Sequence, residues 1–432
     1  MLDPLQAWRS GGDEHEGPGP EVLGGRGRPI APPPSRPTWR RLAFAAIVSV
    51  LVVAIPVLGV VGYRVLSDST DGVFAEASTD PNDPGYEALV QPTPTAVVVQ
   101  LDAEQRLVGA TFLSLSSPDG GGAAIFVPLD VSVLVSNVGA GSLGAVYDAL
   151  ADEPDRAREA LAAKVGDLLN VGVGEVIGLD DARWAQLVAP IAPIRFDNPE
   201  EVDLGDGTTI PPGLVSLEAG QVGPYLAVTK PGESAVARLA RSQVVWKAWL
   251  DQVAKAGRRA VPGETTAGIG RFALGLAGGQ VAYDTLPVNP VAGTDRVSVD
   301  KPKTADLVTE AVPSPAPARP GSRFTVRLLN GVSSGPIPSD LTHDLVRFGG
   351  SVSIIGNGPQ PGQQETTIVY GAQAEADLAK VVLQSLGGQG RARFDAEAPD
   401  TVDLTIVLGK DILGDAPPPA SSSPSASTTT TS

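Results

Sequence analysis

The segments TAVVVQLD at 95–102 and LVGATFLSL at 107–115 decide the fold of this chain. Both are rich in apolar residues that favour strands, and a short charged turn separates them, so they predict two neighbouring strands. Helical periodicity follows in REALAAKVGDLLN at 158–170, and VGEVIGLD at 173–180 predicts a further strand. Strands that alternate with helices indicate an α/β fold built from layers.

Two more helices are expected further along this region. DARWAQLVAPI (181–191) has helical spacing behind an aspartate cap, and ESAVARLARSQVVWKAWLDQVAKAG (233–257) predicts a long helix that a glycine ends. The Pro-rich spacer PSPAPARPG (313–321) then interrupts the pattern. We therefore expect one α/β domain over 95–312, which the spacer closes.

A second, smaller α/β domain is expected over 322–413. RFTVRLLNG (323–331) alternates in the manner of a strand, and TTIVYG (366–371) and VDLTIVLG (402–409) predict two more strands. Among them, QAEADLAKVVLQSLG (373–387) has the apolar spacing of an amphipathic helix. The sequence thus predicts two α/β domains in series.

An uncharged apolar run, LAFAAIVSVLVVAIPVLGVVGY, occupies residues 42–63. As a helix it would be roughly 30 Å long, which matches the hydrocarbon thickness of a bilayer. Arg36, Arg40 and Arg41 precede the run, whereas the charged residues that follow are mainly acidic. The positive-inside rule therefore predicts a single transmembrane helix in the cell membrane, with a cytoplasmic N-terminus and extracytoplasmic C-terminal domains.

Three segments lack the apolar periodicity of folded domains. Residues 1–41 are rich in Gly, Pro and Arg and predict a disordered cytoplasmic tail. Residues 64–94 are polar and contain prolines, which favours a stalk between the membrane and the first domain. Residues 414–432 form a Ser/Thr/Pro-rich end that is expected to be disordered.

Composition excludes several classes of function. The 49 acidic residues outnumber the 32 basic ones, and the resulting net charge of −17 argues against a nucleic-acid partner. The chain has no cysteine, so disulfides and thiolate metal sites are excluded. Its two histidines, His15 and His343, are far apart in the sequence. The sequence therefore assigns no catalytic residue and no metal ligand.

Residues 323–411 resemble the C-terminal domain found on LytR-type cell-envelope proteins. The segments that carry the resemblance include VRLLNGVSSGP (326–336), ETTIVYG (365–371) and VDLTIVLGKD (402–411). They cover nearly the whole of the expected second domain. The resemblance implies an extracytoplasmic envelope protein.

The region 95–312 resembles the LytR-CpsA-Psr (LCP) catalytic domain, which transfers lipid-linked glycopolymers onto peptidoglycan. In ARLARSQVVWKAWL (237–250), Arg238 and Arg241 fall where that family places two arginines before a glutamine, here Gln243. The family holds a lipid pyrophosphate with arginines, acidic residues and a magnesium ion. The resemblance therefore implies that Arg238, Arg241 and Gln243 bind an anion.

Departures from the LCP pattern make this domain look degenerate. The family has a Ser-hydrophobic-Pro-Arg-Asp sequence where this chain reads SLSSPDGGG (114–122), without the arginine. The acid before the first strand is missing from PTPTAVVV (92–99), and the acid before the paired arginines is Ala235. A pyrophosphate needs clustered guanidinium groups, and its metal ion needs carboxylates.

Two interpretations of the arginine pair remain open. Residues three apart on a helix share a side, so Arg238 and Arg241 could bind one phosphate together. Alternatively, they belong to a solvated helix face and form salt bridges with Glu233 or Asp251.

Three functions also remain open. The first is a non-catalytic binding or scaffolding module in cell-wall assembly. The second is a divergent LCP-type phosphotransferase or pyrophosphatase that attaches glycopolymers to peptidoglycan, and the third is a purely structural envelope tether. The expected partners are the membrane and a cell-wall glycopolymer, a lipid-linked precursor or wall-assembly enzymes. No cofactor is expected, except magnesium if the enzyme alternative holds.

Overall fold

The computed structural model describes residues 80–415, apart from 118, 136–138, 231, 234, 262 and 264. The predicted transmembrane run at 42–63 and the predicted tail at 1–41 lie outside these residues, as does nearly all of the tail at 414–432. Among the described residues, no helix is both long and apolar enough to cross a membrane.

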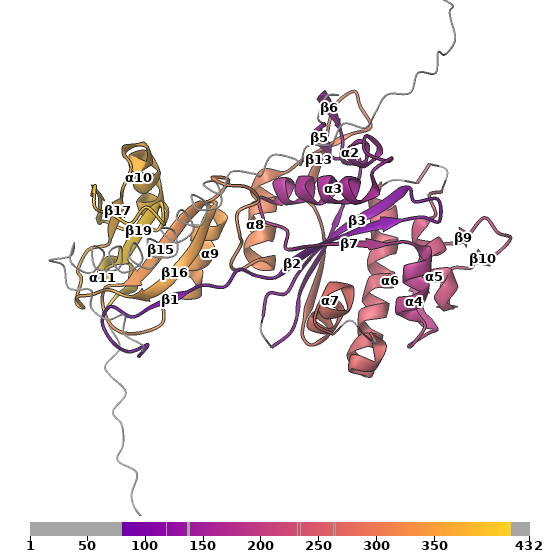
Figure 1. The fold of residues 1–432 in the computed structure, drawn as a ribbon, viewed down its shortest axis with the longest axis horizontal. Helices are drawn as coiled ribbons and strands as arrows, with labels where there is room; N and C mark the ends of the chain where they lie inside the picture. Colours follow the sequence, from indigo (N-terminus) through magenta and orange to yellow (C-terminus); the bar gives the residue numbers. More distant parts are fainter. Residues whose placement is uncertain are drawn as a thin grey trace, which may run out of the picture. The chain divides into compact units, whose positions relative to one another are not determined.

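A five-stranded sheet forms the centre of the first domain (Figure 1). Its strands are, in spatial order, β12 (Val281–Thr285), β4 (Gly122–Val127), β3 (Leu107–Ser114), β2 (Thr95–Leu101) and β7 (Glu175–Leu179). The three central strands are antiparallel neighbours, and each outer strand runs parallel to the one beside it. The pair of strands predicted at 95–102 and 107–115 is confirmed.

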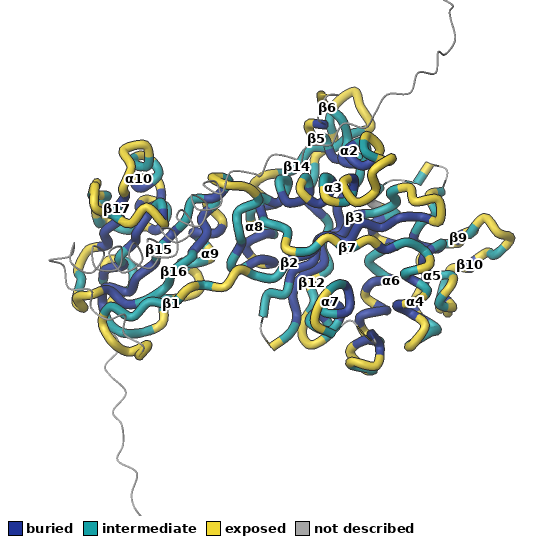
Figure 2. The backbone as a smooth tube through the Cα atoms, viewed as in Figure 1, coloured by how far each residue is buried: buried dark blue, intermediate teal, exposed yellow. Residues whose placement is uncertain are grey.

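Helices cover both faces of this sheet because β2 presents apolar side chains to both sides. Val97 and Val99 belong to one core, with α3 (Pro154–Leu169) and α8 (Lys301–Ala311). Ala96 and Val98 belong to the opposite core, which is built on four other helices. These are α4 (Asp181–Val188), α5 (Ala219–Ala227), α6 (Ala235–Ala256) and α7 (Gly268–Ala277). Figure 2 shows the buried strands between the two helical layers.

Three tryptophans fill the core between α4 and α6. Trp184, Trp246 and Trp249 are almost completely buried, and their rings meet edge to face with centroids 5.3–5.5 Å apart. Such contacts stabilise a core beyond the area that they bury. These rings therefore hold α6 against the rest of the first domain.

Short hairpins and turns complete the first domain, and the sequence did not predict most of them. One hairpin pairs β8 (Ile194–Asn198) with β11 (Gly213–Leu217) and carries a smaller hairpin, β9 (Val202–Asp203) with β10 (Thr209–Ile210). Two more pair β5 (Ser132–Val135) with β6 (Gly139–Ser142) and β13 (Val288–Pro290) with β14 (Val297–Val299). The remaining helices are α2 (Leu143–Asp148) and a 3-10 turn, Gly257–Ala260.

The second domain contains a six-stranded sheet. Its strands, in spatial order, are β1 (Glu87–Leu89), β16 (Gly350–Asn357), β15 (Phe324–Asn330), β19 (Leu404–Leu408), β17 (Thr367–Tyr370) and β18 (Arg391–Phe394). Its helices are α9 (Ser339–Arg347), α10 (Ala376–Ser385) and α11 (Lys410–Leu413), with a 3-10 turn at Gln373–Glu375. Leu328, Ile406 and Val382 are among the residues of its core. The predicted strands and the helix at 373–387 are confirmed.

Part of the segment expected as a stalk over 64–94 belongs to the second domain instead. Strand β1 pairs antiparallel with β16, and Val90 N donates to Ser353 O at 2.9 Å. Glu87 also forms an ion pair with Arg327 of β15. In sequence order, β1 of the second domain therefore precedes β2, which belongs to the first domain.

The spacer at 313–321 is hydrogen-bonded to segments from both domains. Ser314 O accepts from Thr93 N at 2.9 Å, and Ala316 O accepts from Gly172 N at 2.8 Å. On the side of the second domain, Ser351 Oγ donates to Pro315 O at 2.7 Å. The spacer has bends at 313–314 and 318–319 and a turn at 320–321, so it is not the continuously extended segment that its proline content predicted, and its carbonyl groups are used in packing.

Candidate functional site

A cavity of about 550 Å³ lies where β4 ends and where α2 and α6 begin. Its lining includes Asp130 after β4, Arg238 of α6 and Arg296 of the turn before β14. We call it the Arg238 cavity. Arg238 is one of the predicted anion-binding residues. We therefore take the Arg238 cavity as the candidate functional site.

Backbone hydrogen bonds fix the loop that carries Asp130. Gly144 N donates to Leu129 O at 2.9 Å, and Val297 N donates to Asp130 O at 3.2 Å. The start of α2 is capped by Ser142, whose hydroxyl accepts from Ala145 N at 3.2 Å. The loop after β4 is thus held between α2 and the β13–β14 hairpin.

Arg238 is the predicted anion-binding residue that reaches this cavity. Its Nη1 donates to Thr229 Oγ1 at 3.1 Å. Burial lowers the pKa of Arg238 below its usual value, and the nearby charge of Glu233 opposes that shift. The guanidinium group is therefore partly desolvated, which strengthens any contact that it makes with an anion.

Arg241 has a structural role instead. Its side chain is 1% exposed and forms an ion pair with Glu233, whose side chain is 3% exposed. It also donates to the backbone carbonyl of Val228 and lies over the ring of Tyr225, 5.9 Å from the centroid. The interpretation that pairs Arg241 with Glu233 is confirmed for this residue, although the pair is buried rather than solvated.

Gln243 points to a different part of the domain. Its Nε2 donates to Thr285 Oγ1 at 2.9 Å, which ties α6 to the end of β12. The residues Arg238, Arg241 and Gln243 therefore do not converge on one ligand. Of the three, Arg238 lines the cavity.

Carboxylates outnumber guanidinium groups in the Arg238 cavity. Four acidic residues line it, Asp130, Asp148, Glu233 and Asp295, against the two arginines. One oxygen of Asp130, Oδ1, is buried and has no hydrogen-bond partner. Among the described residues, however, no group of three or more acidic or histidine side chains could hold a metal ion. The described part of the lining thus offers no preformed cluster of three ligands for the magnesium ion that the LCP resemblance implies.

The sequence did not single out Arg296, and it gave no reason to place Asp130 beside Arg238. Arg296 belongs to a turn whose composition is ordinary for a hairpin. Asp130 follows a strand and a proline, where acidic residues are common. Asp130 and Arg296 are far from Arg238 in the sequence, and the tertiary fold brings all three to one cavity. The spacing of these residues in the sequence therefore does not identify them as a site.

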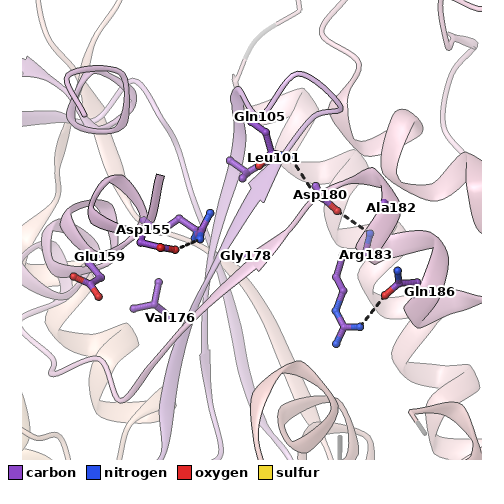
Figure 3. Close-up of a pocket in the computed structure, with 11 residues that line it drawn as sticks. Leu101, Gln105, Asp155, Glu159, Val176, Gly178, Asp180, Ala182, Arg183 and Gln186 are labelled. Atoms are coloured by element: carbon purple, nitrogen blue, oxygen red, sulfur yellow. Dashed lines mark hydrogen bonds and ion pairs between the residues drawn. The ribbon is translucent and has the colours of Figure 1, made fainter. Parts of the chain in front are cut away.

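A second cavity, of about 560 Å³, lies beside the edge strand β7 between α3 and α4 (Figure 3). Several of its charged residues have hydrogen-bond or ion-pair partners within the lining. Arg158 pairs with Asp155, and Asp180 accepts from Gln105 Nε2 at 3.2 Å and from Arg183 N at 2.8 Å. These contacts satisfy the groups locally, so this cavity is the weaker candidate.

Comparison with known families identifies the second domain. Residues 323–411 match the family described as LytR cell envelope-related transcriptional attenuator. None of the curated proteins compared with the chain matches it. The second domain therefore belongs to a class of cell-envelope modules. More specifically, residues 323–411 are a LytR C-terminal domain.

Several solved structures are similar to the chain. TagT from B. subtilis is 14% identical, with 56% of this chain and 96% of that chain covered at a TM-score of 0.39. A LytR-Csp2A-Psr enzyme from Actinomyces oris is 17% identical, with 52% and 95% covered and a TM-score of 0.38. A transcriptional regulator from Enterococcus faecalis is 17% identical, with 50% and 85% covered and a TM-score of 0.38. At these values, the similarity assigns neither a ligand nor an activity to this chain.

Proposed function

We propose that this chain is a membrane-anchored, extracytoplasmic envelope protein that works as a non-catalytic binding or scaffolding module in cell-wall assembly. Its second domain is a LytR C-terminal domain, and its first domain resembles an LCP domain in sequence. The apolar run at 42–63 supports the anchor, and the arginines before it support the orientation.

The observation that carries this proposal is the use of Arg241. Its guanidinium group is buried against Glu233 and the carbonyl of Val228, so it is committed to the fold. The Arg238 cavity is lined by two arginines and four acidic residues. Transfer from a pyrophosphate needs several cations around the phosphates and a metal ion held by carboxylates. This cavity supports the binding of one anionic group better than it supports catalysis.

Binding can be measured with the full chain in detergent micelles. A lipid-linked pyrophosphate glycopolymer is the titrant, and calorimetry is the readout. We expect saturable binding that Arg238→Ala weakens by about tenfold or more, because a charge-assisted hydrogen bond to phosphate is lost. Lys380→Ala, which removes an exposed charge from α10, is the control and should bind normally. The absence of saturable binding, or equal losses in both variants, would refute the proposal.

One observation favours the enzyme alternative. Asp130 Oδ1 is a buried carboxylate oxygen without a partner, and Asp130 lines the same cavity as Arg238. Such an oxygen could contact a cation or accept a proton. If the chain is a divergent phosphotransferase, Asp130→Asn should abolish turnover while binding of the lipid-linked substrate persists.

A further inference from the structure

A third cavity, of about 500 Å³, lies where α3, α8, the spacer and α9 meet. Four basic residues line it, Lys301, Arg319, Arg323 and Arg347, against one carboxylate, Asp167. The chain as a whole has a net charge of −17, so the lining of this cavity has the opposite sign of charge to the whole chain. An anion would be attracted to this cavity against the field of the rest of the protein.

Arg323 is the buried cation of this cavity. It is 5% exposed, and its Nε donates to Asn170 O at 2.6 Å. Its Nη1 donates to Val346 O at 3.1 Å and Gly350 O at 2.9 Å. Backbone carbonyls thus bind two of its three guanidinium nitrogens. Among the described residues, no carboxylate pairs with Arg323, and Nη2 has no hydrogen-bond partner.

A buried charge without a counter-ion is costly, so this arrangement needs a reason. Burial lowers the pKa of Arg323 to about 10, and the side chain therefore remains protonated at neutral pH. Removing a guanidinium ion from water without a counter-ion carries a large desolvation cost. A bound anion would offset that cost.

Thr304 provides an independent observation at the same place. It lines the cavity and is 4% exposed, and its Oγ1 is buried without a hydrogen-bond partner. Buried hydroxyl groups almost always have a partner. A ligand oxygen in the cavity would supply one, because the hydroxyl can donate as well as accept.

The remaining cations lie at the mouth of the cavity. Lys301 begins α8, and among the described residues it has no ion pair. Arg319 lies 3.6 Å from Asp167, which Lys164 also approaches to 3.7 Å. One carboxylate thus faces two cations and cannot neutralise both. Arg347 pairs with Asp306 at 2.7 Å, so it contributes less to the excess.

We propose that this cavity is a binding site for a phosphate group. Arg323 and Thr304 provide the inner donors, and Lys301 and Arg319 provide the charge at the mouth. Several donors that converge from different segments suit a tetrahedral oxyanion. Because the lining comes from both domains, the bound group also holds the second domain against the first. This site uses no residue of the Arg238 cavity, so the two proposals stand or fall separately.

The test measures binding of inorganic phosphate to the full chain by calorimetry at constant ionic strength. We expect Lys301→Ala combined with Arg319→Ala to weaken binding about tenfold or more. Thr304→Val keeps the shape of the side chain and should weaken binding severalfold. Both variants leave the carbonyl contacts of Arg323 intact, and tryptophan fluorescence checks that they fold. The matched control is Lys247→Ala combined with Lys255→Ala, which removes two charges from another cavity.

Two results would overturn the proposal. One is the absence of measurable phosphate binding by the parent chain, and the other is an equal loss of binding in the control. A second titrant separates the sources of the phosphate group. If a poly(glycerol phosphate) binds at least about tenfold more tightly per phosphate than inorganic phosphate, the ligand is a polymer phosphodiester. If the two bind alike, the ligand is free phosphate.

Discussion

At the scale of single residues, the ion pair of Arg241 with Glu233 is the observation on which the proposed function of the first domain rests. Both side chains are buried, and each is the main charged partner of the other. The pair anchors the start of α6 to the segment before it. The LCP resemblance placed Arg241 in an anion site, whereas the structure buries this residue in the core.

We expect Arg241→Met to destabilise the protein by about 3–5 kcal/mol, because it leaves the carboxylate of Glu233 buried and unpaired. Arg238→Met is the comparison and should cost less than about 1 kcal/mol, because it removes one hydrogen bond to Thr229. Urea unfolding followed by tryptophan fluorescence measures both. Similar losses in the two variants would contradict the structural role of Arg241.

A second prediction at this scale concerns Asp181 at the start of α4. Burial raises its pKa to about 6, and the charges of Asp102, Asp180 and Glu104 add to the shift. The folded pKa exceeds the unfolded value of 3.8, so ionisation of Asp181 costs stability. This cost is absent at low pH, develops as the pH rises from the unfolded to the folded pKa, and is complete above about pH 6.

Asp181→Asn should therefore stabilise the protein above about pH 6, by on the order of 1 kcal/mol after allowance for partial exposure. The difference should fade as the pH falls to about 4. Urea unfolding at both pH values is the measurement, and the exposed Asp152→Asn is the control. A gain that is the same at both pH values would mean that ionisation is not its cause.

At the scale of elements, the sequence predicted the segments whose local apolar periodicity is enough to identify a strand or a helix. The strand pair at 95–115 and the long helix α6 have clear periodicity and form as expected. Strand β1 was missed because it has three residues, and its partner β16 lies far along the chain. The site was missed in part for a similar reason. Helical spacing put Arg238 and Arg241 on one side, but it could not reveal that one is buried.

Strand β1 offers a test of that unexpected pairing. Tyr86 and Val90 bond to β16, so by alternation the N–H of Ala88 also faces β16, and that of Leu89 faces away. Ala88→Pro should therefore release β1 and make the segment around 80–94 sensitive to proteases. Leu89→Pro should be tolerated, because that side chain is 74% exposed and its N–H is not needed. Equal protection of both variants in limited proteolysis would contradict the pairing.

At the scale of the whole molecule, the proposed location of the domains rests on charge and on the apolar run at 42–63. An alkaline phosphatase fused after Ser432 should be active, because the enzyme folds only outside the cytoplasm. Green fluorescent protein at the same position is the reciprocal control and should be dark after export by the general secretion route. The opposite pair of results would place both domains in the cytoplasm and refute the proposed orientation.

The central claim is that the first domain binds without catalysing transfer. The most direct measurement is release of phosphate from a lipid-linked pyrophosphate glycopolymer by the full chain with magnesium present. We predict no release above the rate without protein, since Arg241 is committed to the fold and, of the predicted anion-binding residues, Arg238 is the one that lines the cavity. Magnesium-dependent release that Arg238→Ala abolishes, with Lys380→Ala unaffected, would contradict the account and establish an enzyme.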